Sequence, residues 1–331
     1  MSRIGYAQIG TGHGHAAGKM ATFRNSDEFE VIGIAEPDPD MLSRLDTNEA
    51  YKDVPRLSVE QILNDDRVQI VGVETIIRDL LDNAEKCVAA GKHIHLDKPA
   101  GESLPQFKRI LDNAARQHLA VQMGYMYRYH PGIVLSESVL KRGWLGEPFE
   151  LHCVMSKLAD ERLRRELLLY RGGTMLELGC HLIDSVVAIL GVPDQVHAFP
   201  KHSSAQQDGL IDNSLAVFEY PRATATVRTT YTEVDGFERR QFCVCGTEGT
   251  VHLQPLDSPK VARVTLSQPR GDYPRGYQDI PLPDYRRYID DVADLAKIIR
   301  HEKDADYSYE HDYQVQRAIL LAGGRTEAEL R

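Results

Sequence analysis

The sequence predicts an α/β protein of two domains, because its N-terminal and C-terminal parts carry different patterns. Strands alternate with helices over roughly the first 125 residues, an alternation typical of a doubly wound parallel sheet. Strand-like segments then follow one another through short connections that contain Gly or Pro, which favours an antiparallel sheet with one covered face. The predicted domains are residues 1–124 and 125–331.

The first domain begins with a buried strand, a glycine-rich turn and a helix that ends near residue 24. Helices and strands alternate after that. The expected strands are residues 3–9, 30–36, 68–74, 93–97 and 120–126, and the expected helices are residues 59–63, 79–90 and 104–117.

The second domain combines helices with a longer series of strands. A helix over residues 175–190 is almost entirely apolar. The charged segment 160–171 predicts a solvated helix, with a mobile lid as the alternative. The other expected helices are residues 132–141, 285–301 and 310–322, and the expected strands are residues 149–156, 213–220, 223–232, 239–245, 250–254 and 260–267.

Composition excludes several classes of protein. The chain has 331 residues and a formal net charge of −10, which argues against a nucleic-acid or anionic-membrane surface. Five cysteines without framework spacing predict free thiols in a reducing compartment. The first strand begins at Arg3 and no apolar run is long enough to span a bilayer, so we expect a cytoplasmic protein.

The turn after the first strand predicts a dinucleotide site. Gly10 and Gly12 allow a tight turn and a close approach of the backbone to a pyrophosphate, and the following helix supplies amide donors. We expect Thr11 and His13 to take part in this turn. The third glycine of the usual fingerprint is replaced by His15, so the motif rests on its strand–turn–helix context.

Glu36, at the end of the second strand, predicts the choice of cofactor. An acid at this place accepts hydrogen bonds from the ribose hydroxyls and repels a 2′-phosphate. Residues 37–40 offer no arginine for that phosphate, so NAD is favoured over NADP.

Lys98 and three residues of the apolar helix predict a catalytic site. Glu177, His181 and Asp184 fall on one helical face at positions i, i+4 and i+7. Buried ionisable groups are costly unless they are paired or face a wet cleft. Either a histidine base oriented by carboxylates or a satisfied polar cluster fits this helix; Lys98, at the carboxyl end of a parallel strand, favours the histidine base.

Three other pairs of His or Cys residues could each supply two metal ligands, but they do not predict a metal site. His13 with His15, His93 with His95, and Cys243 with Cys245 have a spacing that permits two ligands. A third and fourth ligand at site-like spacing are missing from the sequence, so no metal is predicted.

Several motifs in order resemble the glucose-fructose oxidoreductase / inositol dehydrogenase / rhizopine-catabolism (Gfo/Idh/MocA) family over nearly the whole chain. The segments that carry the resemblance are Gly10-Thr11-Gly12, Gly91-Lys92-His93 with Asp97-Lys98-Pro99, Gly124 to Pro131 with Arg128, Gly172-Gly173 with Glu177, His181 and Asp184, and Gly246 to Thr250.

The resemblance implies a Rossmann domain followed by an α/β domain with a large, open, mainly antiparallel sheet that commonly forms the oligomer interface. It implies Lys98 beside the nicotinamide and the substrate hydroxyl, and His181 as the acid/base. Residues expected at the cofactor also include Thr75 and Asp97. Residues expected at the substrate are Lys98, Tyr125, Arg128, Glu177, His181 and Asp184.

Three departures from the family pattern stand out. Asp97 replaces the usual glutamate and Glu177 the usual aspartate, which changes the reach of both carboxylates. Residues 75–80 lack the proline and histidine that the family often has there, which affects the loop on the nicotinamide side.

The sequence as a whole predicts an NAD-dependent oxidoreductase that acts on a secondary alcohol of a sugar, cyclitol or derivative, assembled as a homodimer or homotetramer. One alternative is a redox-neutral enzyme that retains NAD for hydrolysis, elimination or epimerisation. The other is a non-catalytic dinucleotide-binding sensor, which would not need both Lys98 and His181.

Overall fold

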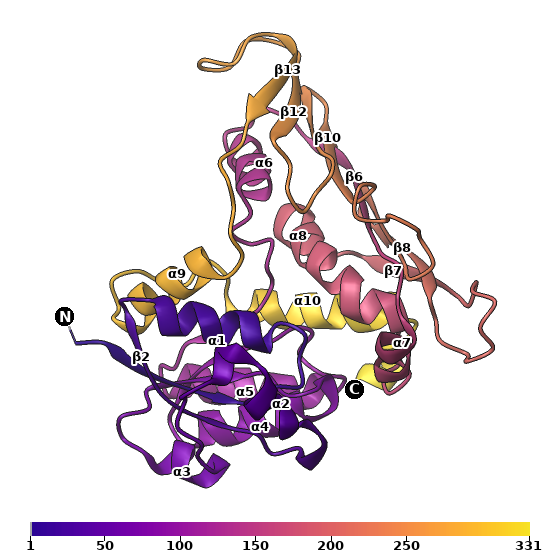
Figure 1. The fold of residues 1–331 in the computed structure, drawn as a ribbon. Helices are drawn as coiled ribbons and strands as arrows, with labels where there is room; N and C mark the ends of the chain where they lie inside the picture. The colour runs from indigo at the N-terminus through magenta and orange to yellow at the C-terminus, as the bar shows by residue number, and fades with distance from the viewer. Residues whose placement is uncertain (1) are drawn as a thin grey trace. The chain divides into compact units, whose positions relative to one another are not determined.

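The computed structural model describes residues 2–331, which form two units (Figure 1). Unit 1 comprises the chain up to Tyr125 together with Arg287–Tyr313. Unit 2 comprises Met126–Arg286 and Gln314–Arg331. The chain first passes from unit 1 to unit 2 after Tyr125, one residue from the predicted domain boundary. The prediction placed all residues after 124 in the second domain, and this needs correction, because residues 287–313 return to unit 1.

Unit 1 is built on a five-stranded parallel sheet, which confirms the predicted doubly wound arrangement. Its strand order is β2-β1-β3-β4-β5, and all four pairs are parallel. The strands are β1 (Ile4–Ile9), β2 (Phe29–Ala35), β3 (Ile70–Val73), β4 (His93–Leu96) and β5 (Val121–Met123). The helices are α1 (Ala16–Asn25), α2 (Ser43–Thr47), α3 (Val59–Asn64), α4 (Ile77–Ala89), α5 (Leu104–Arg116) and α9 (Ile289–Ile299), with short 3₁₀ turns at Pro39–Met41 and Glu49–Tyr51.

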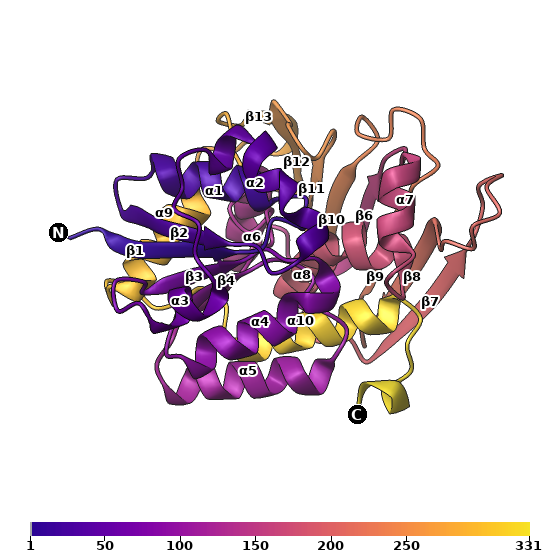
Figure 2. The same cartoon turned by 60° about the horizontal axis from the view of Figure 1, so that its bottom comes forward.

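Helices cover both faces of this sheet. Figure 2 shows α4 and α5 along one face and α1 and α9 along the other. The apolar residues of α9 recur at i, i+3, i+4 and i+7, which gives this helix one stripe to bury. That stripe, formed by Val292, Leu295, Ala296 and Ile299, packs into the core around Tyr6 and Phe23 of unit 1. Burial of this stripe is the physical reason why residues 287–313 belong to unit 1.

Unit 2 is built on an eight-stranded, mainly antiparallel sheet of order β13-β12-β11-β10-β6-β9-β8-β7. Only β6 and β9 pair in parallel among these strands. The strands are β6 (Pro148–Ser156), β7 (Gln195–Lys201), β8 (Asn213–Glu219), β9 (Thr224–Thr230), β10 (Gln241–Gly246), β11 (Gly249–Leu253), β12 (Val261–Leu266) and β13 (Gly276–Pro281). The helices are α6 (Pro131–Lys141), α7 (Glu161–Leu167), α8 (Cys180–Leu190) and α10 (Tyr309–Ala322), which begins in unit 1, with a 3₁₀ turn at Glu327–Leu330.

Helix α8 packs against β6 and β9, the central parallel pair of this sheet. The turn before α8, Met175–Gly179, is a π-helix, so the single α-helix predicted over residues 175–190 is wrong in its first turn. Met175 occupies the space beside Gly179: a Cβ at Gly179 would lie 2.4 Å from the Met175 sulfur. Short π segments are frequent at functional sites because they re-aim the side chains that follow.

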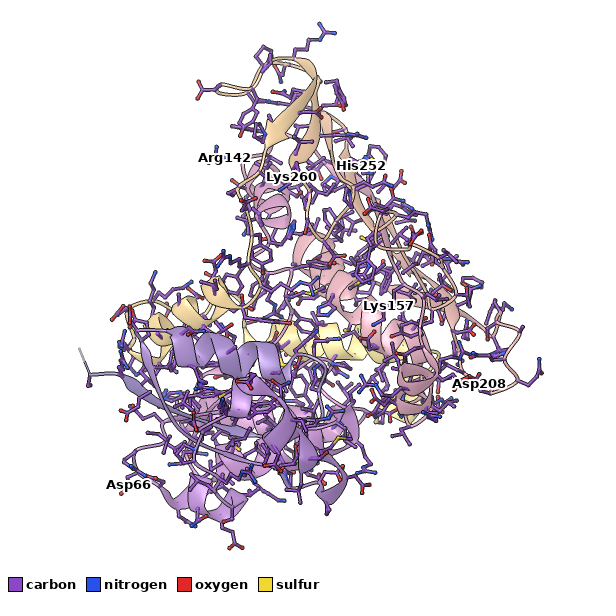
Figure 3. All side chains as sticks on the ribbon, viewed as in Figure 1. Asp66, Arg142, Lys157, Asp208, His252 and Lys260 are labelled. Atoms are coloured by element: carbon purple, nitrogen blue, oxygen red, sulfur yellow. The ribbon has the colours of Figure 1, made fainter. Side chains whose placement is uncertain are left out.

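Helix α7 confirms the predicted helix in the charged segment 160–171. Its Arg164 is buried and donates to Asp208 at 2.7 and 2.8 Å and to Asp212 at 3.0 Å. Asp208, labelled in Figure 3, belongs to the loop between β7 and β8. These charge-assisted bonds fasten α7 to that loop.

Two further findings bear on the composition argument. All five cysteines are free thiols. Within residues 2–331, the helices are all too short or too polar to cross a membrane.

Candidate functional site

The glycine turn after β1 has the geometry of a dinucleotide cradle. Gly10 has φ +91°, and a Cβ there would lie 2.6 Å from the Thr75 backbone nitrogen. A Cβ at Gly12 would lie 2.6 Å from Ile76 Cγ2. Both glycines are therefore required, because the turn packs directly on the segment after β3. Thr75 Oγ1 is buried in this place without a hydrogen-bond partner among residues 2–331, as expected of a group that faces a ligand.

Glu36 lies at the end of β2 and is tied to this turn. Its Oε2 accepts hydrogen bonds from the Thr11 amide and hydroxyl, each at 2.6 Å. Its Oε1 accepts from the Asp38 amide at 2.9 Å. The carboxylate predicted to read the ribose thus lies beside the predicted diphosphate turn.

Arg44, on α2, contacts this turn and was not predicted from the sequence. It lies four residues beyond the segment 37–40, which contains no arginine, and its guanidinium donates to the Thr11 carbonyl at 2.6 Å. The signal for it in the sequence is an arginine in the first turn of the helix that follows this segment.

Asp97, directly after β4, is the centre of a buried polar cluster in unit 1. Its Oδ2 lies 2.7 Å from His13 Nδ1 and 3.0 Å from Lys19 Nζ. Its Oδ1 lies 3.3 Å from His15 Nδ1 and accepts from the Lys98 amide at 2.7 Å. We call His13, His15, Lys19, Glu74, His95 and Asp97 the Asp97 cluster. A contact of Asp97 with the cofactor stays a prediction.

Lys19 joins Asp97 to a second buried carboxylate. Its Nζ donates to Glu74 Oε1 at 3.1 Å, and His95 Nδ1 lies 3.6 Å from the same oxygen. Lys19 comes from α1, Glu74 from the end of β3 and Asp97 from the end of β4. One lysine therefore connects the three segments that meet at the ligand-binding edge of the sheet.

Burial and charge together set the protonation states in the Asp97 cluster. Burial, followed by the charge of Asp97, raises the pKa of Glu74 well above its usual range. Burial alone would raise the pKa of Asp97, but His13, Lys19 and His15 outweigh it and hold that pKa well below its usual range. Burial lowers the pKa of His15 to about 3 against the pull of Asp97. Asp97 is thus ionised and His15 neutral at neutral pH.

The positive charge that this cluster needs comes from Lys19. Burial alone would lower the pKa of Lys19, but the charges of Asp97 and Glu74 outweigh burial and raise that pKa. His13, His15 and Asp97 each offer one ligand atom within 4.8 Å of the others, a spacing that a metal ion can use. The ammonium of Lys19 already compensates the Asp97 carboxylate at this place.

Lys98 follows Asp97 at the carboxyl end of β4 and is buried. Unit 1 therefore contains all eight residues predicted for the cofactor. These are Gly10, Thr11, Gly12, His13, Glu36, Thr75, Asp97 and Lys98, all at the carboxyl ends of β1 to β4 or in the segments that follow them. Tyr125, predicted at the substrate, is buried just after β5.

Glu177 lies in the π turn before α8 and has two partners from the sheet of unit 2. It accepts a short hydrogen bond from the Tyr231 hydroxyl. Lys157 Nζ, labelled in Figure 3, lies 3.8 Å from Glu177 Oε1 and 5.4 Å from the centre of the Tyr231 ring. Lys157 and Tyr231 were missed from the sequence because each directly follows a strand, β6 or β9, and carries no motif of its own.

Asp184 and Arg128, both predicted at the substrate, pair with each other. Arg128 donates from Nε to Oδ2 at 3.0 Å and from Nη2 to Oδ1 at 2.7 Å, a buried bidentate pair. His181, one turn before Asp184 on α8, packs edge-on against the Tyr127 ring at 5.8 Å between centroids. Their contacts with substrate stay predictions.

Comparison with known proteins gives the family of the chain. Residues 4–125 match the oxidoreductase family with an NAD-binding Rossmann fold, and residues 136–252 match the Gfo/Idh/MocA C-terminal domain. The chain belongs to the Gfo/Idh/MocA family of oxidoreductases, which confirms the resemblance found in the sequence.

Three similar proteins illustrate the relationship. Myo-inositol 2-dehydrogenase of Thermotoga maritima is 21% identical over 90% of this chain and 87% of that protein. Trans-1,2-dihydrobenzene-1,2-diol dehydrogenase of Bos taurus is 23% identical over 70% of this chain and 68% of that protein. The structure of UDP-N-acetylglucosamine 3-dehydrogenase from Acidithiobacillus ferrooxidans superposes over all of both chains with a TM-score of 0.80 at 16% identity, which shows a shared fold.

The buried pairs of Lys19 generate a stability prediction. Lys19→Met leaves two buried carboxylates without their cation, so we expect the free energy of unfolding at pH 7.5 to fall by about 3–5 kcal/mol. Without Lys19 the folded carboxylates bind protons more tightly than the unfolded ones, so the loss shrinks as pH falls from 7.5 to 5. Denaturant unfolding at the two pH values measures both effects.

Lys108→Met is the matched control, because Lys108 forms an exposed i,i+4 pair with Asp112 on α5. It removes the same charge and is expected to cost less than about 1 kcal/mol. Equal losses in the two variants would contradict the role assigned to Lys19.

Proposed function

We propose that the protein transfers hydride between nicotinamide of NAD and a secondary alcohol of a sugar, cyclitol or derivative. The observation that carries the proposal is Lys98 at the carboxyl end of β4, in the unit that also holds the cradle of Gly10 and Gly12. Ligands of parallel sheets bind at these strand ends. The named relatives that oxidise inositol and a dihydrodiol support a polyol as substrate.

The residues present fit a dinucleotide. The cradle, Glu36 at the end of β2 and the buried Thr75 hydroxyl provide a surface for diphosphate and ribose. When bound, nicotinamide supplies the hydride-transfer chemistry.

The side chains of the chain handle the substrate proton and the charge on its oxygen. Lys98 donates a hydrogen bond to the reacting oxygen and stabilises the negative charge that develops there. His181 takes the hydroxyl proton as general base. Glu177, with its partners Tyr231 and Lys157, binds a further hydroxyl or orients His181.

The assembly and location belong to the same proposal. Leu215 and Val217 on β8 alternate with buried Ala216 and Phe218, so they point to the other face of the sheet, and Phe199, paired with Leu215, is half exposed. An apolar sheet face of this kind supports a homodimer or homotetramer joined through unit 2. The five free thiols support a reducing compartment, the cytoplasm.

The first prediction from this proposal concerns the cofactor. Glu36 repels a 2′-phosphate, so we expect NAD to bind at least about tenfold more tightly than NADP, as the repulsion of one like-charge contact near a surface permits. Titration calorimetry with both cofactors measures the ratio. Glu36→Gln should reduce the preference for NAD over NADP. Asp40→Asn, which removes the same charge from an exposed site nearby, should leave that preference unchanged. Equal affinities in the wild type would contradict the assignment.

The second prediction tests the proposed function itself. Lys98→Ala should lower kcat by about 100-fold or more with myo-inositol or trans-1,2-dihydrobenzene-1,2-diol as substrate, because one donor to a developing oxyanion contributes about 3 kcal/mol. NAD affinity should stay near that of the wild type. Lys201→Ala, at an exposed position of β7, is the control. Product without accumulation of NADH would instead support the redox-neutral alternative.

The third prediction concerns His181. If His181 is the base, the rate of oxidation rises with pH through one ionisation near neutrality. His181→Asn should lower kcat and abolish that rise. His118→Asn is the matched control, since His118 is exposed and its φ of +55° is one that asparagine tolerates. A rise that survives in His181→Asn assigns the proton to another group.

A further inference from the structure

Two cysteines and two histidines lie on one face of the sheet of unit 2. Cys243 on β10 is paired in register with His152 on β6 and with His252 on β11, which Figure 3 labels. Residues opposite each other in neighbouring antiparallel strands share a face, with Cβ atoms about 5 Å apart. Cys245, two residues further along β10, points to that same face. The pairing of three strands thus provides the third and fourth candidate ligands that the sequence around Cys243 and Cys245 lacks.

The two thiols are spaced as ligands of one metal ion. Cys243 Sγ lies 3.8 Å from Cys245 Sγ. Two thiolates on a tetrahedral ion, with metal–sulfur bonds of about 2.3 Å, also lie about 3.8 Å apart. Both cysteines are half-buried rather than enclosed in the core, so an ion from solvent can reach them. The positions of the sulfurs therefore match one edge of a tetrahedral site.

A redox disulfide fits this pair less well. Positions i and i+2 of an extended strand place their Cα atoms about 6.6 Å apart, near the upper end of the range that a disulfide spans. Burial, then the Cys245 thiol and then Glu150 raise the pKa of Cys243 to about 12, so its thiol is a poor nucleophile at neutral pH. A divalent cation instead stabilises the thiolates that it binds.

Each histidine contacts a neutral oxygen through one of its ring nitrogens. His152 Nδ1 lies 2.7 Å from Thr226 Oγ1, and His252 Nε2 lies 3.2 Å from Gln241 Oε1. A ligating histidine commonly donates its second ring N–H to an oxygen, which fixes the tautomer and orients the ring. Burial, followed by the charges of Arg263 and His152, lowers the pKa of His252, so that ring is neutral at neutral pH, the form that binds a metal.

Ligation requires a movement of the histidine side chains. Among residues 2–331, the groups of donor atoms within 4.8 Å of one another do not include the two sulfurs together with a histidine nitrogen. Both rings are half-buried on the sheet face, where side chains change rotamer rapidly. Rotation toward Cys243 from the two flanking strands completes the ligand set and leaves the pairing of the strands intact.

We propose that these two thiols and two imidazoles bind a Zn²⁺ ion on the sheet of unit 2. The ligands are Cys243, Cys245, His152 and His252. Two sulfur and two nitrogen donors in a tetrahedral arrangement are a set that Zn²⁺ favours. All four ligands come from one chain and from the adjacent strands β6, β10 and β11, so the ion links the middle strands of the sheet. The site does not depend on the proposed function.

Metal titration of the whole protein tests the site. The protein is reduced, freed of metal with a chelator and titrated with Zn²⁺ in competition with a chromogenic chelator. We expect a single Zn²⁺ per chain to bind. Titration with Co²⁺ should give a sulfur-to-metal charge-transfer band and the visible absorption of a tetrahedral ion, because Co²⁺ would take the place of Zn²⁺.

Variants identify the ligands. Cys243→Ser should weaken Zn²⁺ binding by about 100-fold or more, because it removes a ligand rather than a group that supports one. It should also lower the charge-transfer band of Co²⁺. The double variant His152→Gln, His252→Gln should weaken binding but keep the charge-transfer band. Thermal melting establishes that each variant is folded.

Two control variants are matched to the ligands. His197→Gln removes a histidine from the same face, since the register runs from His197 through Val217 and Thr226 to His152. Cys153→Ala removes a buried thiol from the opposite face of the same sheet. Both variants should keep the zinc affinity of the wild type.

The wild type alone can overturn the proposal. Absence of stoichiometric Zn²⁺ binding, or Co²⁺ binding without a charge-transfer band, excludes the thiols as ligands, and neither result needs a variant to fold. Unchanged affinity in Cys243→Ser or in the double histidine variant overturns the ligand set. NAD binding and hydride transfer are measured separately, so failure of the zinc site leaves the proposed function standing.

Discussion

The buried bridge of Lys19 to Glu74 and Asp97 is the interaction on which the cofactor half of the molecule depends. One ammonium from α1 lies 3.1 Å from a carboxylate after β3 and 3.0 Å from a carboxylate after β4. Each carboxylate would be costly to bury alone, and together they would repel each other. With Lys19 between them they fix the ends of two strands against the helix that follows the glycine turn. Lys98 and His13 take their positions from this arrangement.

In unit 2, a π turn before α8 allows the polar residues of an apolar helix to find partners. A regular α-helix from Met175 would continue the 3.6-residue repeat into α8, but the i→i+5 bonds of the π segment shift Glu177 relative to His181 and Asp184. Glu177 then meets Tyr231 and Lys157 from the sheet, while Asp184 pairs with Arg128. The polar residues of an apolar helix thus have separate partners rather than one shared role.

The sequence did not predict the strands whose residues are mostly exposed, because such strands show little alternation of apolar and polar residues. The edge strands β7 and β13 were missed because most of their residues are exposed or half-buried, so no clear alternation of apolar and polar residues marks them. The inner strands β8 to β12 were found because each alternates buried side chains with less buried ones. Boundaries of strongly amphipathic helices such as α5 agreed within a residue.

The sequence by itself determined the two sheets, the glycine turn and the family, because these depend on local periodicity and on short motifs in order; the roles of Lys98 and His181 stay predictions. Only the tertiary structure decided which charged and polar groups pair with one another. The return of α9 to unit 1, Arg44 on the turn, the pairing of Arg128 with Asp184 and the donors around Asp97 all join segments far apart in the chain. Such pairings depend on how buried charges find compensation in three dimensions, and no local pattern of residues records that.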